Sequence, residues 1–158
     1  MGKPSRLHAV NHFENEAYVH GNKYQELLLT KSPLSRWYQL VHEQNASGIE
    51  SLLAENVVFY SPVAHTPKTG KAVASKYLSA AFKVFFNETF RYVREIASSH
   101  DAVLEFQVEI DGIIVNGVDL IKWDDEGKIV EFKVMLRPLK AINLIHQKMA
   151  VMLERTDT

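Results

Sequence analysis

The sequence contains no cysteine, which excludes disulfide bonds, thiolate zinc sites and a cysteine nucleophile. It also lacks an excess of either charge, because 18 lysines and arginines stand against 19 aspartates and glutamates, for a net charge of -1. A protein that grips a nucleic-acid backbone normally carries a basic excess, so nucleic acid is not an expected partner. No apolar run approaches the roughly 18 residues of a membrane-spanning helix, and the N-terminus lacks the apolar core of a signal peptide. We therefore expect a cytoplasmic protein with no membrane partner.

The length and composition of the chain suit one compact domain. Its 158 residues are 46% apolar, and a chain of this size buries about 70% of the surface that its unfolded form exposes. Residues 1–31 are polar and carry several histidines, which predicts a loosely ordered arm or an extra packed segment rather than a second domain. The single domain is predicted to cover residues 32–155. His8 and His12 are four residues apart, but no third ligand is clearly placed with them, so neither a metal nor another cofactor is expected.

The first half of the domain follows a helical period. Ser32 and Ser47 are the expected N-caps of the first two helices, and Pro33 suits the first position of a helix. A strand is predicted at residues 56–61, followed by a loop punctuated by prolines. The three predicted helices are residues 32–44, 47–55 and 70–85.

From residue 88 onward the apolar residues alternate instead, which is the period of a strand. Asp111 and Gly112 predict a hairpin turn, and Pro138 opens a last helix at residues 139–154. Helices followed by an antiparallel meander predict an α+β fold, in which a curved sheet wraps around the helices as a cone and leaves an apolar cavity at its wide end. The four predicted strands are residues 89–97, 102–110, 113–123 and 128–137.

The order of these elements resembles the NTF2-like superfamily, in particular its SnoaL-like and ketosteroid isomerase branches. The resemblance covers residues 33–137 and rests on SGIESLLAENVVFYSPV, on Gly70 and Lys71 at the start of the third helix, and on VDLIKWDDEGKIVEFKV. The added C-terminal helix, with the phrase VMLRPLKAINLIHQKM, is similar to uncharacterised bacterial SnoaL-like proteins. The resemblance also implies a homodimer through the outer face of the sheet, which is predicted to carry Glu105, Gln107, Glu109, Glu131 and Lys133.

Asp119 is a single acid among residues that otherwise predict a buried strand. The resemblance places it on the acid that, in ketosteroid isomerases, donates a hydrogen bond to the enolate oxygen of the substrate. Apolar surroundings would raise the pKa of this carboxyl, so that it could donate or exchange a proton near neutral pH. The structural alternative is a satisfied polar group that is bonded to a buried tyrosine or arginine.

Two positions depart from the isomerase pattern. Ser61 stands where those enzymes have a proton-shuttling aspartate before a proline, and Trp37 stands where they have the oxyanion-hole tyrosine. A serine hydroxyl is too weak a base and an indole does not titrate, so steroid isomerisation by that mechanism is not expected. His65 is the remaining candidate base, and its alternative is an exposed loop histidine. A triad of Ser61, His65 and Asp119 is disfavoured, because Ser61 lacks the strand-to-helix elbow that exposes such nucleophiles.

Two hypotheses follow for the function. The first is a small-molecule-binding SnoaL-like enzyme, an isomerase or cyclase that acts by proton transfer on an apolar carbonyl-containing substrate, with Asp119 as acid and His65 as base. The second is a noncatalytic ligand-binding or dimerisation module. Hydrolysis of an epoxide or ester would need a second carboxylate beside Asp119. The residues expected to form the ligand-binding wall or the core are Trp37, Tyr38, Phe59, Ser61, Tyr77, Phe106, Trp123, Phe132 and Val134.

Overall fold

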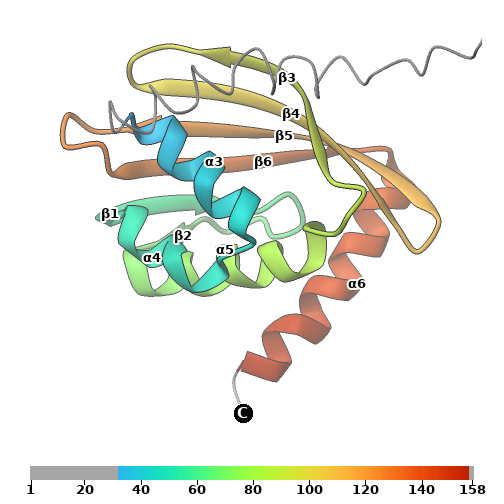
Figure 1. Cartoon of the computed structure of the whole chain (residues 1–158). Coiled ribbons are helices and arrows are strands. Elements are labelled where there is room, and N and C mark those ends of the chain that lie inside the picture. Colours follow the sequence, from blue (N-terminus) through green and yellow to red (C-terminus); the bar gives the residue numbers. More distant parts are fainter. Residues whose placement is uncertain (1–31, 157–158) are drawn as a thin grey trace, which may run out of the picture.

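The computed structural model describes residues 32–156. The arm predicted for residues 1–31, with His8 and His12, lies outside the described residues. No helix within residues 32–156 combines the length and the apolar character that crossing a membrane requires. The elements in chain order (Figure 1) are α3 (Pro33–Glu43), η1 (Ala46–Gly48), α4 (Ile49–Leu52), β1 (Leu53–Tyr60), β2 (Lys68–Thr69), α5 (Lys71–Phe85), β3 (Arg91–Ala97), β4 (Asp101–Ile110), β5 (Ile113–Trp123), β6 (Ile129–Arg137) and α6 (Leu139–Thr156).

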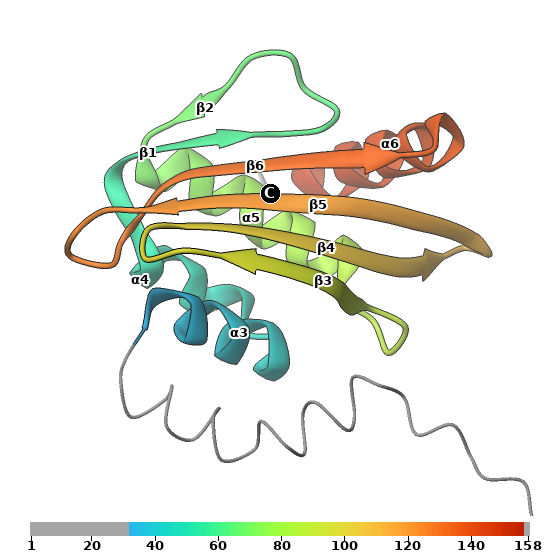
Figure 2. The same ribbon diagram turned by 90° about the horizontal axis from the view of Figure 1, so that it is seen from above.

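Six strands form one curved sheet in the order β2-β1-β6-β5-β4-β3. Figure 1 shows α3 and α5 beneath one face of this sheet, and the opposite face is not covered by any described helix. Seen from above, α5 passes beneath the sheet and α6 leaves from the end of β6 (Figure 2). The predicted α+β arrangement, a curved sheet around helices with an added C-terminal helix, is confirmed.

One strand pair differs from the predicted antiparallel sheet. β1 pairs in parallel with β6, with Phe59 opposite Phe132, so the sheet is mixed. The other neighbouring strands are antiparallel, including the short β2, which lies within the predicted loop. The predicted meander of residues 89–137 is antiparallel. The direction of β1 could not be predicted, because the alternation of apolar residues is the same in both directions.

The local start of each helix follows from its capping residues. Ser32 caps α3, since its Oγ accepts a hydrogen bond from the backbone nitrogen of Ser35 at 3.1 Å, and Pro33 occupies the first turn, as predicted. The second helix is shorter than predicted and does not have Ser47 as its cap. Instead Asn45 accepts from the backbone nitrogen of Gly48 at 3.1 Å, and the chain is already extended at Leu53, where β1 begins.

Side chains alternate between the two faces along the central strands. The turn between β4 and β5 has positive φ at Asp111 (50°) and Gly112 (75°), which confirms the predicted hairpin. The inner face packs on α3 and α5, and α6 adds its own buried residues at the end of the sheet. The inward residues of β4 and β5 are Ala102, Leu104, Phe106, Val108, Ile110, Val115, Gly117, Asp119, Ile121 and Trp123.

Candidate functional site

Asp119 lies in the middle of β5 on the face that the helices cover. Its neighbour on β4 is Leu104 and its neighbour on β6 is Val134, and both are buried. Asp119 is 6% exposed and is the one buried residue with an ionisable carboxyl within residues 32–156. A buried carboxyl needs hydrogen-bond partners, because removing it from water disfavours its charged form.

Two aromatic residues connect Asp119 to α3 and β3. The hydroxyl of Tyr92 donates a hydrogen bond to Oδ2 of Asp119 at 3.0 Å. The indole Nε1 of Trp37 donates to the hydroxyl oxygen of Tyr92, also at 3.0 Å. All three residues are buried, so this hydrogen-bond chain lies outside bulk water. The structural alternative for Asp119, a bond to a buried tyrosine, is therefore present at Oδ2.

Burial is the main cause of the pKa shifts of Asp119 and Tyr92. It raises the pKa of Asp119 to about 7, although the hydrogen bond from Tyr92 acts in the opposite direction by stabilising the carboxylate. Burial, together with the negative charge of Asp119, raises the pKa of Tyr92 well above its usual value. At neutral pH Asp119 is therefore divided between its neutral and ionised forms, while Tyr92 remains a hydroxyl donor.

A small apolar cavity adjoins Asp119. Its volume is about 30 Å³, enough for roughly one or two water molecules, whereas pockets for drug-sized ligands measure about 300–1,000 Å³. Asp119 is the single ionisable side chain among its described lining residues. These residues are Trp37, Leu78, Ala81, Phe82, Phe85, Phe86, Phe90, Phe106, Asp119, Phe132 and Val134.

Comparison with known proteins identifies the family. A family profile described as the SnoaL-like domain matches residues 34–132. This chain belongs to the SnoaL-like family. A steroid delta-isomerase from Pseudomonas aeruginosa is 35% identical, with a TM-score of 0.75 over 80% of this chain and 92% of that one. The predicted resemblance to SnoaL-like and NTF2-like proteins is confirmed.

Further solved structures are similar to this SnoaL-like chain. An uncharacterised protein with a cystatin-like fold from Silicibacter pomeroyi is 32% identical, with a TM-score of 0.69 over 75% of this chain and 83% of that chain. An NTF2-like protein of unknown function from Mesorhizobium loti is 20% identical and shares the fold, with a TM-score of 0.59 over 69% of this chain and 91% of that chain. No curated protein matches the chain in sequence.

The SnoaL-like cone brings some of the predicted site residues together and separates others. Trp37, Asp119 and three more predicted residues, Phe106, Phe132 and Val134, line the cavity. Phe59 and Trp123 are buried in the core without lining it, and Tyr38 and Tyr77 are half-buried elsewhere in the packed structure.

Ser61, predicted to bind the ligand, and His65, predicted to be the base, are not among the described residues that line the cavity. Ser61 is half-buried, and its Oγ accepts a hydrogen bond from the backbone nitrogen of Val63 at 3.2 Å. His65 is exposed, on the same loop. His65 is neither a partner of Asp119 nor part of the cavity lining. In Figure 2 the segment between β1 and β2 loops outward at the edge of the sheet that β2 forms.

Sequence reasoning missed Tyr92 and several phenylalanines of the cavity. Tyr92 lies on β3 opposite Phe106, and a buried tyrosine normally needs a partner for its hydroxyl. That rule singles out Tyr92 once β3 is placed, but it does not name Asp119 as the partner. The cavity residues missed on α5 and the following loop are Leu78, Ala81, Phe82, Phe85, Phe86 and Phe90.

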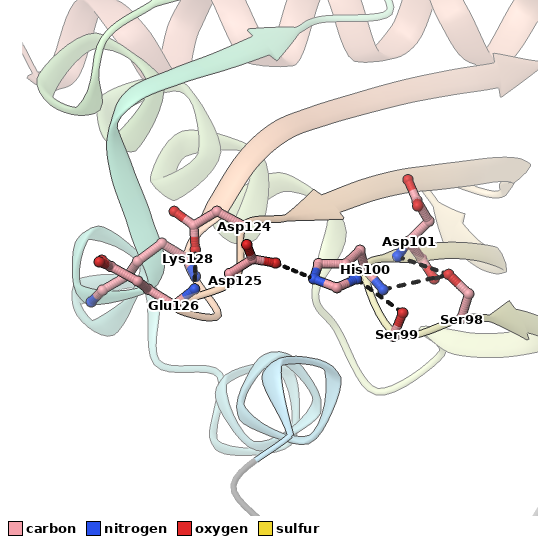
Figure 3. Close-up of polar contacts among 8 residues, drawn as sticks. All are labelled: Ser98, Ser99, His100, Asp101, Asp124, Asp125, Glu126 and Lys128. Atoms are coloured by element: carbon pink, nitrogen blue, oxygen red, sulfur yellow. Dashed lines mark hydrogen bonds and ion pairs between the residues drawn. The ribbon is translucent and has the colours of Figure 1, made fainter.

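A second polar cluster lies at the end of the sheet, where the β3–β4 and β5–β6 turns meet (Figure 3). Ser99 Oγ and His100 Nδ1 share a hydrogen bond of 2.9 Å, and His100 Nε2 lies 2.8 Å from Oδ1 of Asp125. Asp124 caps its own turn by accepting from the backbone nitrogen of Lys128 at 2.9 Å. Within residues 32–156, no group of three histidine or acidic side chains is arranged to hold a metal ion.

Proposed function

We propose that this SnoaL-like protein binds a small apolar molecule that carries a carbonyl group, and that it acts on this molecule as an isomerase or cyclase through Asp119. One observation carries the proposal: the only ionisable side chain among the described cavity-lining residues is a carboxyl whose pKa, at about 7, lies close to neutral pH. A general acid or base works best when its pKa is near the pH at which it operates.

The proposed chemistry needs one carboxyl group. Neutral Asp119 passes its proton to the carbonyl oxygen of the substrate and becomes a carboxylate. The carboxylate then takes a proton from the carbon next to the carbonyl, or from a hydroxyl group of the same substrate that attacks to close a ring. Asp119 ends the cycle in its starting form. His65, which is exposed, has no part in this scheme.

The steroid delta-isomerase relative supports an isomerase, but not by the mechanism of ketosteroid isomerases. This chain is 35% identical to that protein. Ser61 lies outside the cavity lining, and Trp37 directs its only donor to Tyr92. Neither residue can therefore supply the base or the tyrosine of the ketosteroid isomerase pattern, and the substrate proposed here is not restricted to steroids.

A carbonyl-containing molecule larger than one or two waters requires the cavity of about 30 Å³ to enlarge, and we place this opening at Phe86 and Phe90. Both residues are half-buried, and they lie at the two ends of the loop that joins α5 to β3. The ring of Phe86 packs edge-on against Phe82 and Phe90, with both centroid distances at 4.3 Å. Movement of these two rings on the loop would enlarge the cavity without disturbing the sheet.

A noncatalytic ligand-binding or dimerisation module is the second candidate function. The small cavity volume, about 30 Å³, and the bond that already satisfies Oδ2 of Asp119 favour it. In that case Asp119 would be a satisfied polar group and the loss of its charge would leave any bound molecule unaffected.

We also expect two copies to associate through the outer face of the sheet. Val103, Ile114 and Met135 are 36%, 47% and 56% exposed on that face. Beside them Arg94 Nε lies 3.4 Å from Oε2 of Glu105. This face therefore carries both apolar and charged side chains, as protein interfaces with an apolar centre and a polar rim do. A two-fold axis would bring the same residues of both copies together. Light scattering should show a dimer that Met135→Glu converts to a monomer, and a monomeric wild-type protein would end this expectation.

The exchange of hydrogen next to a carbonyl provides the test of the proposed activity. The probe is 1-tetralone, an apolar aryl ketone, in deuterated buffer at pH 7, and proton NMR measures the loss of the signal from its α-carbon. We expect the wild-type protein to accelerate this exchange over buffer and Asp119→Asn to lower the enzymatic rate at least about tenfold, since acid–base groups usually contribute a hundredfold or more.

The matched control is Asp125→Asn, which makes the same change at an exposed carboxyl whose side chain is 98% accessible. It should exchange 1-tetralone at the wild-type rate. Equal rates for the wild type and Asp119→Asn would remove Asp119 from the chemistry. Binding of 1-tetralone without accelerated exchange would favour the noncatalytic module.

A further inference from the structure

The hydrogen-bond chain from Trp37 to Asp119 runs in one direction only. An indole nitrogen carries a hydrogen and has no lone pair to accept with, so Trp37 must donate to the hydroxyl oxygen of Tyr92. The hydrogen of Tyr92 is then left for Oδ2 of Asp119, which it reaches at 3.0 Å. A serine or second tyrosine in place of Trp37 could reverse this order, but an indole cannot.

The direction of the chain distinguishes the two oxygens of Asp119. Oδ2 receives a hydrogen bond from Tyr92, whereas Oδ1 receives none from any residue within 32–156. A neutral carboxyl places its hydrogen on the oxygen that is not already accepting from a donor, because two hydrogens directed at one oxygen repel each other. Asp119 is one of the residues that line the cavity, and Oδ1 is its oxygen without a bond from a described residue.

We propose that Tyr92 and Trp37 are positioning residues that keep the proton of Asp119 on Oδ1, the oxygen to which no described residue donates. This inference rests on the proposed function, in which that proton is the one passed to the carbonyl oxygen of the substrate. It assigns two roles: Tyr92 selects the oxygen, and Trp37 selects the orientation of the Tyr92 hydroxyl.

The surroundings of Asp119 contain no competing charged group among the described residues that pack against it. Tyr92 is the single titratable group in contact with the carboxyl. Tyr38 packs its ring against Tyr92 at 5.6 Å, but its hydroxyl is directed to Glu95. The other neighbours are apolar: Leu104 on β4, Val134 on β6, and Phe82 and Phe85 from α5. The hydrogen bond from Tyr92 thus has no ionic substitute.

Carbon-13 NMR of the Asp119 carboxyl in the ligand-free protein tests this inference. We expect Tyr92→Phe, which keeps the ring and removes the hydroxyl, to raise the pKa of Asp119 to about 8 or above, since a hydrogen bond to a charged group is worth about 1.5–3 kcal/mol. Trp37→Phe should give a smaller rise, because Tyr92 then loses the donor that strengthens its own hydrogen bond. The control Tyr60→Phe removes a hydroxyl on β1 outside this chain and should leave Asp119 unchanged.

The indole resonance of Trp37 provides a second measurement that a purely structural role would not affect. In the wild-type protein the Trp37 Nε1–H signal should shift with the titration of Asp119, transmitted through Tyr92. In Tyr92→Phe that shift should disappear, while the signal of Trp123 serves as the internal reference. An unchanged pKa in Tyr92→Phe, or a Trp37 signal that still follows Asp119, would overturn the inference.

These measurements separate the inference from the proposed function. If Tyr92→Phe raises the pKa but Asp119→Asn exchanges 1-tetralone normally, the positioning chain stands and the enzymatic proposal fails. If Asp119→Asn is inactive and Tyr92→Phe titrates as the wild type does, the enzymatic proposal stands and the positioning chain fails.

Discussion

Within residues 32–156, one buried and one exposed network of hydrogen-bonded side chains each end at an aspartate. Trp37, Tyr92 and Asp119 form the first beneath the sheet, and Ser99, His100 and Asp125 form the second at its end (Figure 3). The bond lengths are similar, between 2.8 and 3.0 Å. Asp119 is 6% exposed, while the side chain of Asp125 is 98% exposed. The comparison shows that a hydrogen-bond partner alone does not distinguish Asp119, whose pKa is raised by burial while its hydrogen bond from Tyr92 acts in the opposite direction.

The largest expected difference between the buried and the exposed hydrogen-bond network is in how the stability of the protein depends on pH. The pKa of Asp119 is 3.8 in the unfolded reference and about 7 in the folded protein, so between these values the unfolded chain releases a proton that the folded chain keeps. Stability from this group is complete below the lower value and is lost as the pH rises through the upper one. From pH 5 to pH 8 the wild type should lose about 3 kcal/mol of unfolding free energy relative to Asp119→Asn.

Urea unfolding at several pH values measures this difference. The amide of Asp119→Asn stays neutral and can still accept from Tyr92, so only the titration is removed. Asp125→Asn is the matched control, since it makes the same chemical change at a side chain that is 98% exposed. Parallel curves for the wild type and Asp119→Asn would contradict the buried, titrating carboxyl.

Adding one carbon should lower the free energy of unfolding at the buried site but not at the exposed one, and this difference is smaller than the pH effect. Gly117 lies two residues before Asp119 on the inner face, and an added Cβ would come within 2.3 Å of the Phe106 ring and 2.7 Å of Leu136. Overpacking of this kind costs about 1–3 kcal/mol, so Gly117→Ala should lower the unfolding free energy by that amount. Asp125→Glu, which also adds one carbon, should change it by less than about 0.5 kcal/mol. Equal stabilities would show that the cavity wall yields freely.

Enlarging the cavity should change the affinity for a ligand, and we expect this effect to be smaller in free energy than the two above. Phe86→Ala removes a half-buried ring between Phe82 and Phe90 and enlarges the space beside Asp119. We expect 1-tetralone to bind several-fold more tightly, because the wild-type protein must first move this ring to admit it. Titration followed by NMR measures the dissociation constant. Unchanged or weaker binding would place ligand entry elsewhere.

The exposed hydrogen bonds of Ser99, His100 and Asp125 should contribute least to stability. A hydrogen bond between exposed side chains replaces equally good bonds to water, so His100→Ala should shift the thermal midpoint by less than about 2 °C. Calorimetry at low and high salt checks this value. A larger shift would mean that His100 and Asp125 hold the two turns together and that exposure is a poor guide to their importance.

Much of the fold was predictable because it depends on contacts that are close in the sequence. The cap of α3 involves Ser32 and a residue three positions later, and the hairpin between β4 and β5 depends on the adjacent Asp111 and Gly112. The alternation along β5 was enough to place Asp119 on a largely apolar face. The parallel pairing of β1 with β6 was not predictable, since it joins residues more than 70 positions apart in the chain, such as Phe59 and Phe132.

The identity and order of the residues determined an α+β chain with a single acid on a buried strand, since periods of 2 and 3.6 are local properties of the backbone. Only the tertiary structure decided that Tyr92, 27 positions away, donates to this acid, that Trp37, 55 positions from Tyr92, sets the direction of the bond, and that His65 stays in solvent. Such contacts depend on how three elements pack around one cavity, and no spacing along the chain encodes them.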